Sequence, residues 1–334
     1  MTVRTSLRLA ACAALLLLAA PAAAQTSQEL ELLRSEVPQD QGARFGFFGI
    51  WETWANINRD RPETGMWLWL SPQVKWEPAA MRAQLNLKIN FDFLKRMDNY
   101  GTYIDDPSLE FAVDRIVQDP DKIFTLGAKV RYFVPASKAS MDANSRGQLR
   151  GYLKATVMVW KLMFAAEFNA QKYFNKFTTW APDAPAGSDS WFQSMGREDV
   201  IENNTSYGLG ETLYGTYTPI DGLDISLIWG LIQSRHYQPT TGHGDQYGSS
   251  YLQDPRWTTW DHAFKFIADV TWNIGAAPSI AESDSLKDSF LKNLYLSAGY
   301  FILAPQLQNG GTTRSLNPFN PKYASVYFDV SVVY

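Results

Sequence analysis

The chain of 334 residues has a single cysteine, Cys12, and it lies near the N-terminus. One cysteine can form neither an internal disulfide nor a thiolate-ligated zinc or iron–sulfur site. The 34 acidic residues nearly balance the 30 basic ones, and no long block of like charge occurs. This balance argues against nucleic acid as a partner. No HExxH motif, phosphate-binding glycine loop or calcium loop is present, so no metal or cofactor is expected.

The first residues have the pattern of a secretory signal peptide. Arg4 and Arg8 precede an apolar stretch over residues 9–20 and a run of small residues that ends at Ala24. This order predicts export and cleavage after Ala24, so that residues 1–24 form the signal peptide. Residues 25–42 are polar and lack a strand period, and they are expected to form a periplasmic lead-in. Residues 43–334 are then expected to form one domain.

Long apolar runs are also missing, although aromatic residues are abundant. Beyond residue 24 no segment approaches the roughly 18 consecutive apolar residues of a transmembrane helix. Yet aromatics are 14% of the chain, with 12 Trp, 16 Tyr and 19 Phe, while the mean hydropathy is slightly negative. This combination is typical of a β-barrel in a membrane, where lipid-facing and lumen-facing residues alternate and aromatics ring both interfaces.

An apolar–polar alternation, which is the period of a β-strand, recurs along the chain. It is clearest over residues 83–93, where every second residue is apolar. We predict an all-β, antiparallel, up-and-down transmembrane barrel of about twelve strands, each near the roughly 9 to 11 residues that cross a bilayer. The predicted strands cover residues 44–56, 65–76, 83–93, 108–118, 122–133, 148–159, 163–173, 205–218, 223–229, 264–274, 292–303 and 326–334.

The connections between these strands are of two kinds. Tight turns are expected at residues 76–79, 118–121, 160–161 and 219–222, and longer polar loops at residues 96–107, 135–147, 176–204, 237–257 and 305–322. Residues 58–64 are a short loop among the long ones, and residues 275–287 are a long turn among the short ones. Short turns on one rim and long loops on the other are typical of outer-membrane barrels, and an even number of strands places both termini in the periplasm.

The last strand carries a motif. Val326, Phe328, Val330 and Val332 are apolar at alternate positions, and the chain stops at an aromatic residue, Tyr334. This resembles the C-terminal assembly signal of Gram-negative outer-membrane, porin-like β-barrel proteins, although Phe is the commoner last residue there. The resemblance implies a location in the outer membrane among its lipids and the barrel-assembly machinery as a transient partner.

If the apolar alternates face lipid, the opposite parity faces the lumen, because a basic residue on the lipid face costs up to about 2 to 4 kcal/mol near the midplane. We therefore expect a lumen of mixed charge in a passive channel for small polar solutes or ions, with Arg131, Arg150 and Lys154 forming a basic stripe on neighbouring strands. The predicted lumen residues are Lys75, Lys88, Asp92, Lys129, Arg131, Arg150, Lys154, Glu167, Asp224, Lys265, Asp269 and Asp329.

Other functions stay open at this point. The same charged groups can pair and fill the lumen, since about twelve strands lie between filled eight-stranded barrels and wide pores of sixteen or more. Such a barrel would be an anchor, adhesin or receptor, with Trp180, Trp191 and Phe192 in the loop over residues 176–204 as binding residues.

An outer-membrane hydrolase is a further alternative and needs a general base beside a nucleophile. Of the three histidines, His243 lies in a glycine-rich loop and His262 has the parity of the lipid face. Only His236 has a serine, Ser234, on the same expected strand face. We therefore expect that the protein is not an enzyme.

Overall fold

The structure is a computed structural model. It describes residues 42–57, 64–76, 79–92, 102–137, 140–141, 144–176, 179–180, 202–203, 205–236, 260–283, 290–305 and 317–333. The expected signal peptide, nearly all of the expected lead-in, His243, Trp191, Phe192 and Tyr334 lie outside these residues.

Twelve long strands make up the fold, and each corresponds to a predicted one. They are β1 (Ala43–Asn56), β2 (Thr64–Trp76), β3 (Met81–Asp92), β5 (Ser108–Gln118), β6 (Phe124–Phe133), β7 (Ser145–Val159), β8 (Leu162–Asn175), β11 (Thr205–Ile220), β12 (Leu223–His236), β13 (Trp260–Asn273), β14 (Leu294–Pro305) and β15 (Ala324–Val333). Two short strands of two residues each, β9 (Thr179–Trp180) and β10 (Glu202–Asn203), pair with each other in a separate antiparallel ribbon.

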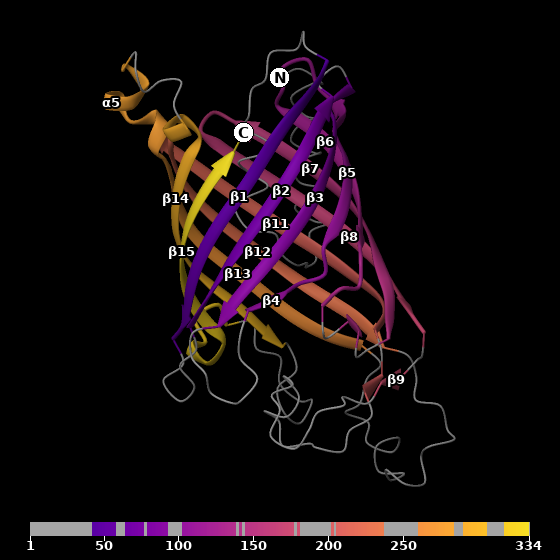
Figure 1. The fold of residues 1–334 in the computed structure, drawn as a ribbon. Helices are drawn as coiled ribbons and strands as arrows, with labels where there is room; N and C mark the ends of the chain where they lie inside the picture. Colours follow the sequence, from indigo (N-terminus) through magenta and orange to yellow (C-terminus); the bar gives the residue numbers. More distant parts are fainter. Residues whose placement is uncertain are drawn as a thin grey trace, which may run out of the picture.

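The twelve strands close into an antiparallel barrel (Figure 1). Each strand pairs with its neighbours along the chain, and β1 pairs with β15 through Glu52 opposite Asp329. Closure leaves no open sheet edge among these strands, which is the condition for a sheet to cross a bilayer. The predicted up-and-down barrel is confirmed.

One further strand, β4 (Thr102–Ile104), lies in the stretch that we had predicted as a loop over residues 96–107. It pairs with Ile89–Phe91 of β3, while β5 pairs with Met81–Asn86 of the same strand. Between the two, the backbone N–H of Asp105 donates to Lys88 O at 3.0 Å. β4 therefore continues the line of β5 along β3, beyond an interruption at residues 105–107. The predicted loop over residues 96–107 was wrong at residues 102–104, which form this strand.

The two rims differ as predicted. We call the end with the short connections β2–β3, β5–β6, β7–β8 and β11–β12 the turn rim, and the opposite end the loop rim. The long connection on the turn rim, between β13 and β14, contains the short helices η4 (Ile274–Ala276), α5 (Pro278–Ala281) and η5 (Phe290–Asn293). β1 begins and β15 ends at this rim (Figure 1).

Most predicted strand ends differ from the structure by one to four residues, and the strand predicted over residues 223–229 continues to His236 as β12. At three ends the prediction ran into a turn or a helix, each for a local reason. Lys122 has a φ of 54° in the turn before β6, and the side chain of Asp119 accepts the Phe124 N–H at 2.6 Å, so that the strand begins at Phe124. Ile274 and Lys292 belong to η4 and η5 instead of strands.

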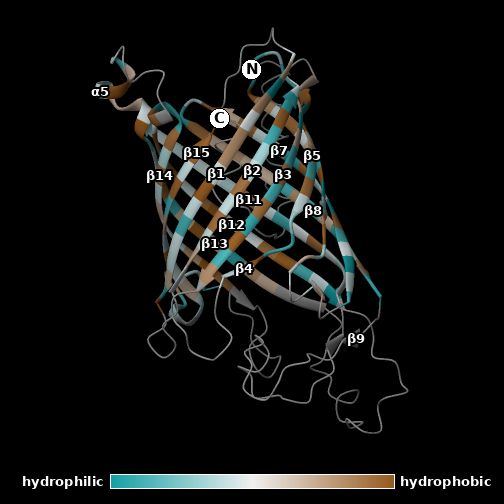
Figure 2. Cartoon of the chain, in the orientation of Figure 1, coloured by the Kyte–Doolittle hydropathy of each residue, from teal (hydrophilic) through white to brown (hydrophobic). Residues whose placement is uncertain are grey.

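Burial is inverted relative to a water-soluble protein. Large apolar side chains such as Trp51, Leu153 and Phe164 are exposed on the outer face, and polar ones line the inside. Figure 2 shows the matching alternation of hydrophobic and hydrophilic residues along the strands. Among the side chains that the structure describes, more of the buried ones are polar or charged than apolar. An outward apolar band around a polar interior is the pattern of a membrane-spanning barrel.

In the described part of the chain, no helix has the length and apolar character needed to span a membrane.

Candidate functional site

The inward face of the barrel is the candidate site. Strand residues alternate between the two faces, so one parity of every strand points inward. Six predicted lumen residues are buried, namely Arg131, Glu167, Asp224, Lys265, Asp269 and Asp329. Lys75, Lys88, Lys129, Arg150 and Lys154 are partly buried. The side chain of Asp92 lies outside the described residues. The role of this set in lining a pore stays a prediction.

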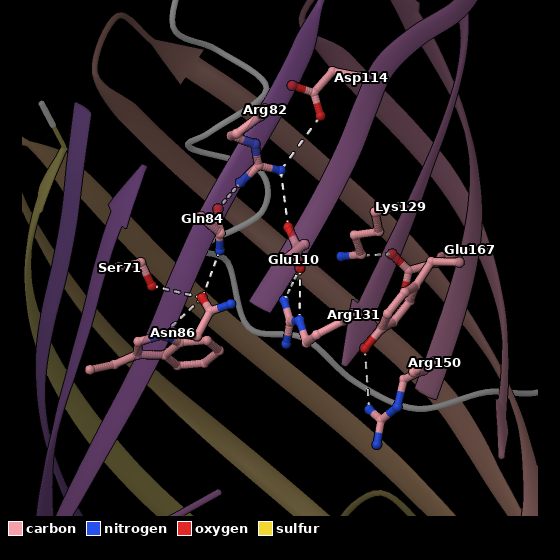
Figure 3. Close-up of polar contacts among 12 residues, drawn as sticks. Ser71, Arg82, Gln84, Asn86, Glu110, Asp114, Lys129, Arg131, Arg150 and Glu167 are labelled. Atoms are coloured by element: carbon pink, nitrogen blue, oxygen red, sulfur yellow. Dashed lines mark hydrogen bonds and ion pairs between the residues drawn. The ribbon is translucent and has the colours of Figure 1, made fainter. Parts of the chain in front are cut away.

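Five basic side chains gather on three strands, and we call them the basic wall; Figure 3 shows four of them, Arg82, Lys129, Arg131 and Arg150. They are Arg82 on β3, Lys129 and Arg131 on β6, and Arg150 and Lys154 on β7. The register places Arg131 opposite Arg150 and Gly127 opposite Lys154. The expected basic stripe therefore occupies adjacent strands, and it is larger than the sequence suggested.

Three carboxylates hold the basic wall in place. Glu110 lies 3.4 Å from Arg82 and accepts a hydrogen bond from Arg131 Nε at 2.7 Å. Asp114 lies 3.5 Å from Arg82, and Glu167 lies 3.6 Å from Lys129. Five cations against three carboxylates leave this side of the lumen with a surplus of positive charge.

Sequence reasoning missed Arg82 and Glu110, although a signal for both was present. Arg82 has the parity of Lys88, which was predicted to face the lumen. Glu110 alternates with Leu109 and Phe111, which are exposed on the outer face. Extending the parity rule over the whole of each strand would have found both.

Aromatic rings cover parts of the basic wall. Lys129 Nζ lies 4.3 Å from the centroid of the Tyr152 ring, and Arg150 Nη1 donates to Tyr152 Oη at 3.3 Å. Lys154 Nζ lies 4.3 Å from the centroid of the Tyr214 ring. A ring face attracts a cation and fixes its position without neutralising it.

Side-chain amides continue the polar lining onto β2 and β3. Gln84 Nε2 and Ser71 Oγ both donate to Asn86 Oδ1, at 2.6 and 2.8 Å. The neighbouring Gln73 is buried, and neither its amide nitrogen nor its amide oxygen meets a hydrogen-bond partner within the described residues. Buried polar groups of this kind normally bond to water.

Acidic residues dominate the side of the barrel across from the basic wall. Glu52 faces Asp329 across β1 and β15, and it accepts a hydrogen bond from Trp67 Nε1 at 2.6 Å. Tyr327 Oη donates to Asp269 at 3.1 Å. Sequence reasoning missed Glu52 because it has the parity of Ile50, which is apolar yet buried inside. The rule that apolar alternates face lipid was wrong on this strand.

A recess of about 60 Å³ opens in the lumen wall beside the basic wall. Arg82, Lys129, Lys154, Asp114 and Glu167 contribute to its lining, together with smaller residues of β6 and β7. A register shift in β5 between Val113 and Val117 bends the wall at this place. Gly127 has the inward parity of Lys129 and adds no side chain, so the recess stays open.

Apolar side chains line part of the lumen as well. Tyr214, Ile228, Ile267 and Tyr327 form one buried cluster with Ala165. The register pairs Thr156 with Ala165, Ala165 with Tyr214, Tyr214 with Ile228, and Ile228 with Ile267. Thr156 lines the recess. The recess and the cluster are therefore parts of one continuous row across β7, β8, β11, β12 and β13, which we call the apolar row.

The residues considered for an enzyme do not form a described catalytic site. Ser234 and His236 both lie on β12, but the side chains of His236 and His262 are not among those described. Within the described ranges, no group of three or more His, Cys, Asp or Glu side chains is placed to hold a metal ion.

Comparison with known proteins identifies the fold. The chain resembles the COG4313 outer membrane channel from Pseudomonas putida F1, with a TM-score of 0.52 and 11% sequence identity over 89% of this chain and 99% of that one. The NanC porin has a TM-score of 0.42 at 10% identity, covering 87% and 99% of the two chains, and the KdgM porin 0.40 at 9%, covering 86% and 99%. No family model matches, and no curated protein matches. The fold is that of outer-membrane channels.

Proposed function

We propose that this protein is a narrow outer-membrane channel for the passive passage of small polar solutes or ions. The observation that carries the proposal is the charged and amide-rich lining inside a closed barrel whose outer face is apolar. A lining with buried groups such as the Gln73 amide needs water or solute to satisfy it. The COG4313 channel, whose fold this chain resembles, is itself described as an outer membrane channel.

The contacts inside the barrel favour a lined wall over a filled lumen. The Arg82–Glu110 and Arg131–Glu110 ion pairs join adjacent strands, and the Lys129–Glu167 pair skips one strand. Each of these pairs, all among the described residues, runs along the wall of the barrel. The lumen carries charges of both signs, so only a weak preference for anions is expected, from ions that pass beside the basic wall.

In this proposal the turn rim lies in the periplasm, the outer band contacts lipid, and the barrel-assembly machinery reads the last strand. Val326 and Phe328 are exposed on the outer face, as an amphipathic terminal strand requires. Replacement of Tyr334 by Ser is expected to reduce the folded fraction in outer-membrane preparations, while Val326→Leu is expected to leave it unchanged.

Single-channel recording in a planar bilayer tests the function. Wild-type protein should give stable conductance steps, and its reversal potential in a salt gradient should show anion preference. Arg150→Gln should shift that potential toward cations. Protein that migrates as a folded, heat-modifiable band yet gives no conductance would contradict the channel and favour the filled barrel that acts as an anchor or receptor.

A further inference from the structure

A row of three polar side chains crosses the outer face of the barrel near the loop rim, and we call it the outer row. Lys172 on β8 pairs with Tyr207 on β11, and Tyr207 pairs with Arg235 on β12. Lys172 has the parity of Phe168 and Arg235 that of Leu227, and both of these apolar residues are exposed on the outer face. Since paired residues share one face of a sheet, the whole row points away from the lumen.

The outer row lies at the level of a membrane interface. Tyr207 and Tyr217 are ten positions apart on the outer face of β11. At about 3.4 Å per residue and a tilt of about 40°, they are about 26 Å apart across the membrane, close to the roughly 25 Å of the apolar band. Tyr217 packs against Trp160 at the turn rim, with ring centroids 6.4 Å apart. Tyr207 therefore belongs to the opposite aromatic girdle, at the depth of the lipid headgroups.

Contacts within the outer row fix the position of its guanidinium group. Arg235 Nη1 donates to Tyr207 Oη at 2.7 Å, and the guanidinium carbon lies 5.4 Å from the centroid of the Tyr207 ring. Lys172, on the other side of Tyr207, is exposed. Neighbouring strands are about 4.8 Å apart, so the backbones at Lys172 and Arg235 are about 10 Å apart, and the two long side chains can reach one group between them.

The charges of the outer row suit a phosphate. Among the outward residues of β8, β11 and β12, all of which the structure describes, Glu211 is the only carboxylate. It lies four positions from Tyr207, which is about 14 Å along the strand. A guanidinium binds two phosphate oxygens at once, and an ammonium adds a second point of positive charge. The row therefore offers a phosphate two cations at the headgroup level.

Exposed apolar surface continues from the outer row toward the middle of the membrane. Leu149, the ladder neighbour of Lys172, is 41% exposed, and the pair Leu153 and Phe168 is 48% and 45% exposed. Gly151 lies between Leu149 and Leu153 on β7 and adds no side chain there. A lipid whose phosphate lies in the outer row would therefore place its acyl chains on this surface.

We propose that the outer row binds the phosphate group of a lipid headgroup in the outer leaflet, with the acyl chains against Leu153 and Phe168. Lys172 and Arg235 bind the phosphate oxygens from either side, and Tyr207 holds Arg235 in place. The inference rests on the orientation given with the proposed function, in which the loop rim lies at the outer surface. It adds a specific lipid partner on the outer face to the channel within.

Native mass spectrometry of the protein folded in a neutral maltoside detergent counts the bound lipid molecules. The probe is lipid A, a phosphorylated glycolipid of Gram-negative outer leaflets. Wild-type protein should bind it saturably. The same lipid stripped of its phosphates should bind at least about tenfold more weakly, the effect of losing a hydrogen bond to a charged group. Inorganic phosphate in large excess should displace little of the lipid, because it has no acyl chains.

Variants of the outer row locate the site. Lys172→Gln and Arg235→Gln should each weaken lipid A binding about tenfold. Lys161→Gln is the matched control, because Lys161 lies 5.9 Å from the centroid of the girdle residue Trp160, but at the turn rim. This control should bind lipid A as the wild type does. Heat-modifiable migration verifies that each variant is folded.

Equal loss of binding in Lys161→Gln and Lys172→Gln would show a general attraction of girdle cations and would overturn the site. Equal binding of the lipid without phosphates, or displacement by inorganic phosphate at the concentration of the lipid itself, would overturn it too. Conductance in a planar bilayer without saturable lipid A binding would remove the site and leave the channel function standing. Saturable lipid A binding by a folded protein that gives no conductance would have the opposite meaning.

Discussion

Glu110 and Arg131 face each other on adjacent strands, and one carboxylate oxygen of Glu110 accepts hydrogen bonds from both Nε and Nη2 of Arg131. The Glu110 carboxylate also lies 3.4 Å from Arg82. Both Glu110 and Arg131 are buried, with 4% and 5% of their surface exposed. Glu110 therefore holds two guanidinium groups of the basic wall in fixed positions.

Glu110→Ala should destabilise the barrel strongly, because it leaves two buried guanidinium groups without their shared carboxylate. Loss of one partner of a buried ion pair typically costs about 3 to 5 kcal/mol. Urea unfolding from lipid vesicles, followed by tryptophan fluorescence, measures the change. The double variant Glu110→Leu with Arg131→Met should recover much of the loss, and a double variant that is no more stable than Glu110→Ala would show that the ion pair is not the cause.

The fold was predictable because the alternation of apolar and polar residues survives on nearly every strand. The alternation predicts a strand over residues 108–118, and these are the bounds of β5. The rule that apolar alternates face lipid failed on β1, where Ile50 and Glu52 share the inward face. Where part of the lumen is apolar, an apolar residue can face either the lipid or the lumen. The alternation of a single strand then does not show which of its two faces points inward.

The contacts of the site depend on the register between neighbouring strands. The alternation of residues within one strand does not reveal that register. Lys129 reaches Glu167 across the intervening strand β7, and Lys154 reaches Tyr214 across β8. The recess depends on a register shift near Asp114, where the alternation of β5 ends. Composition and alternation therefore predict that the lumen is polar and charged. Which side chains contact one another inside it can be known only from the register of the closed barrel.

Gly127→Ala should cost about 1 to 3 kcal/mol, the usual effect of overpacking, because its Cβ would meet the backbone of the β5 bulge. The expected contacts are 2.8 Å to Asp114 O and 3.2 Å to Val113 O. Gly151→Ala is the matched control on the neighbouring strand, since a Cβ there meets nothing within 4 Å. Urea unfolding compares the two, and equal midpoints would show that the wall adapts freely at the recess.

Asp106 should make the loop between β6 and β7 sensitive to acid. Partial burial raises the pKa of Asp106, but hydrogen bonds from Ser140 Oγ and from the backbone N–H groups of Ser137 and Ala136 outweigh it and lower the pKa below its usual value. Because the pKa of Asp106 is lowered in the folded state, its ionised carboxylate stabilises the contact at pH values above the ordinary pKa of about 3.9. This stabilisation is lost as the pH falls through the lower pKa of the folded state.

Hydrogen exchange at Ala136 and Ser137, corrected for the intrinsic rate, tests this expectation. Both amides should be protected at pH 6 and should lose protection below about pH 3.9 as Asp106 becomes protonated. Asp106→Ala should remove the protection at both pH values. Protection that persists in the variant, or that does not change with pH in the wild type, would show that the loop is held by other contacts.

Glu211 lies on the lipid-facing side of β11, between Tyr207 and Tyr217 on the same face. Its ladder partners are Phe168 and Leu231, and its Oε2 is buried without a hydrogen-bond partner among the described residues. An acidic residue on the lipid face costs less than the roughly 2 to 4 kcal/mol of a basic one, so Glu211→Leu should stabilise the barrel by about 1 kcal/mol. Urea unfolding from vesicles measures it, with Glu211→Gln as a polar control. A loss of stability in Glu211→Leu would mean that the carboxylate makes a favourable contact in the membrane, and cross-linking between barrels would then show whether a second copy supplies it.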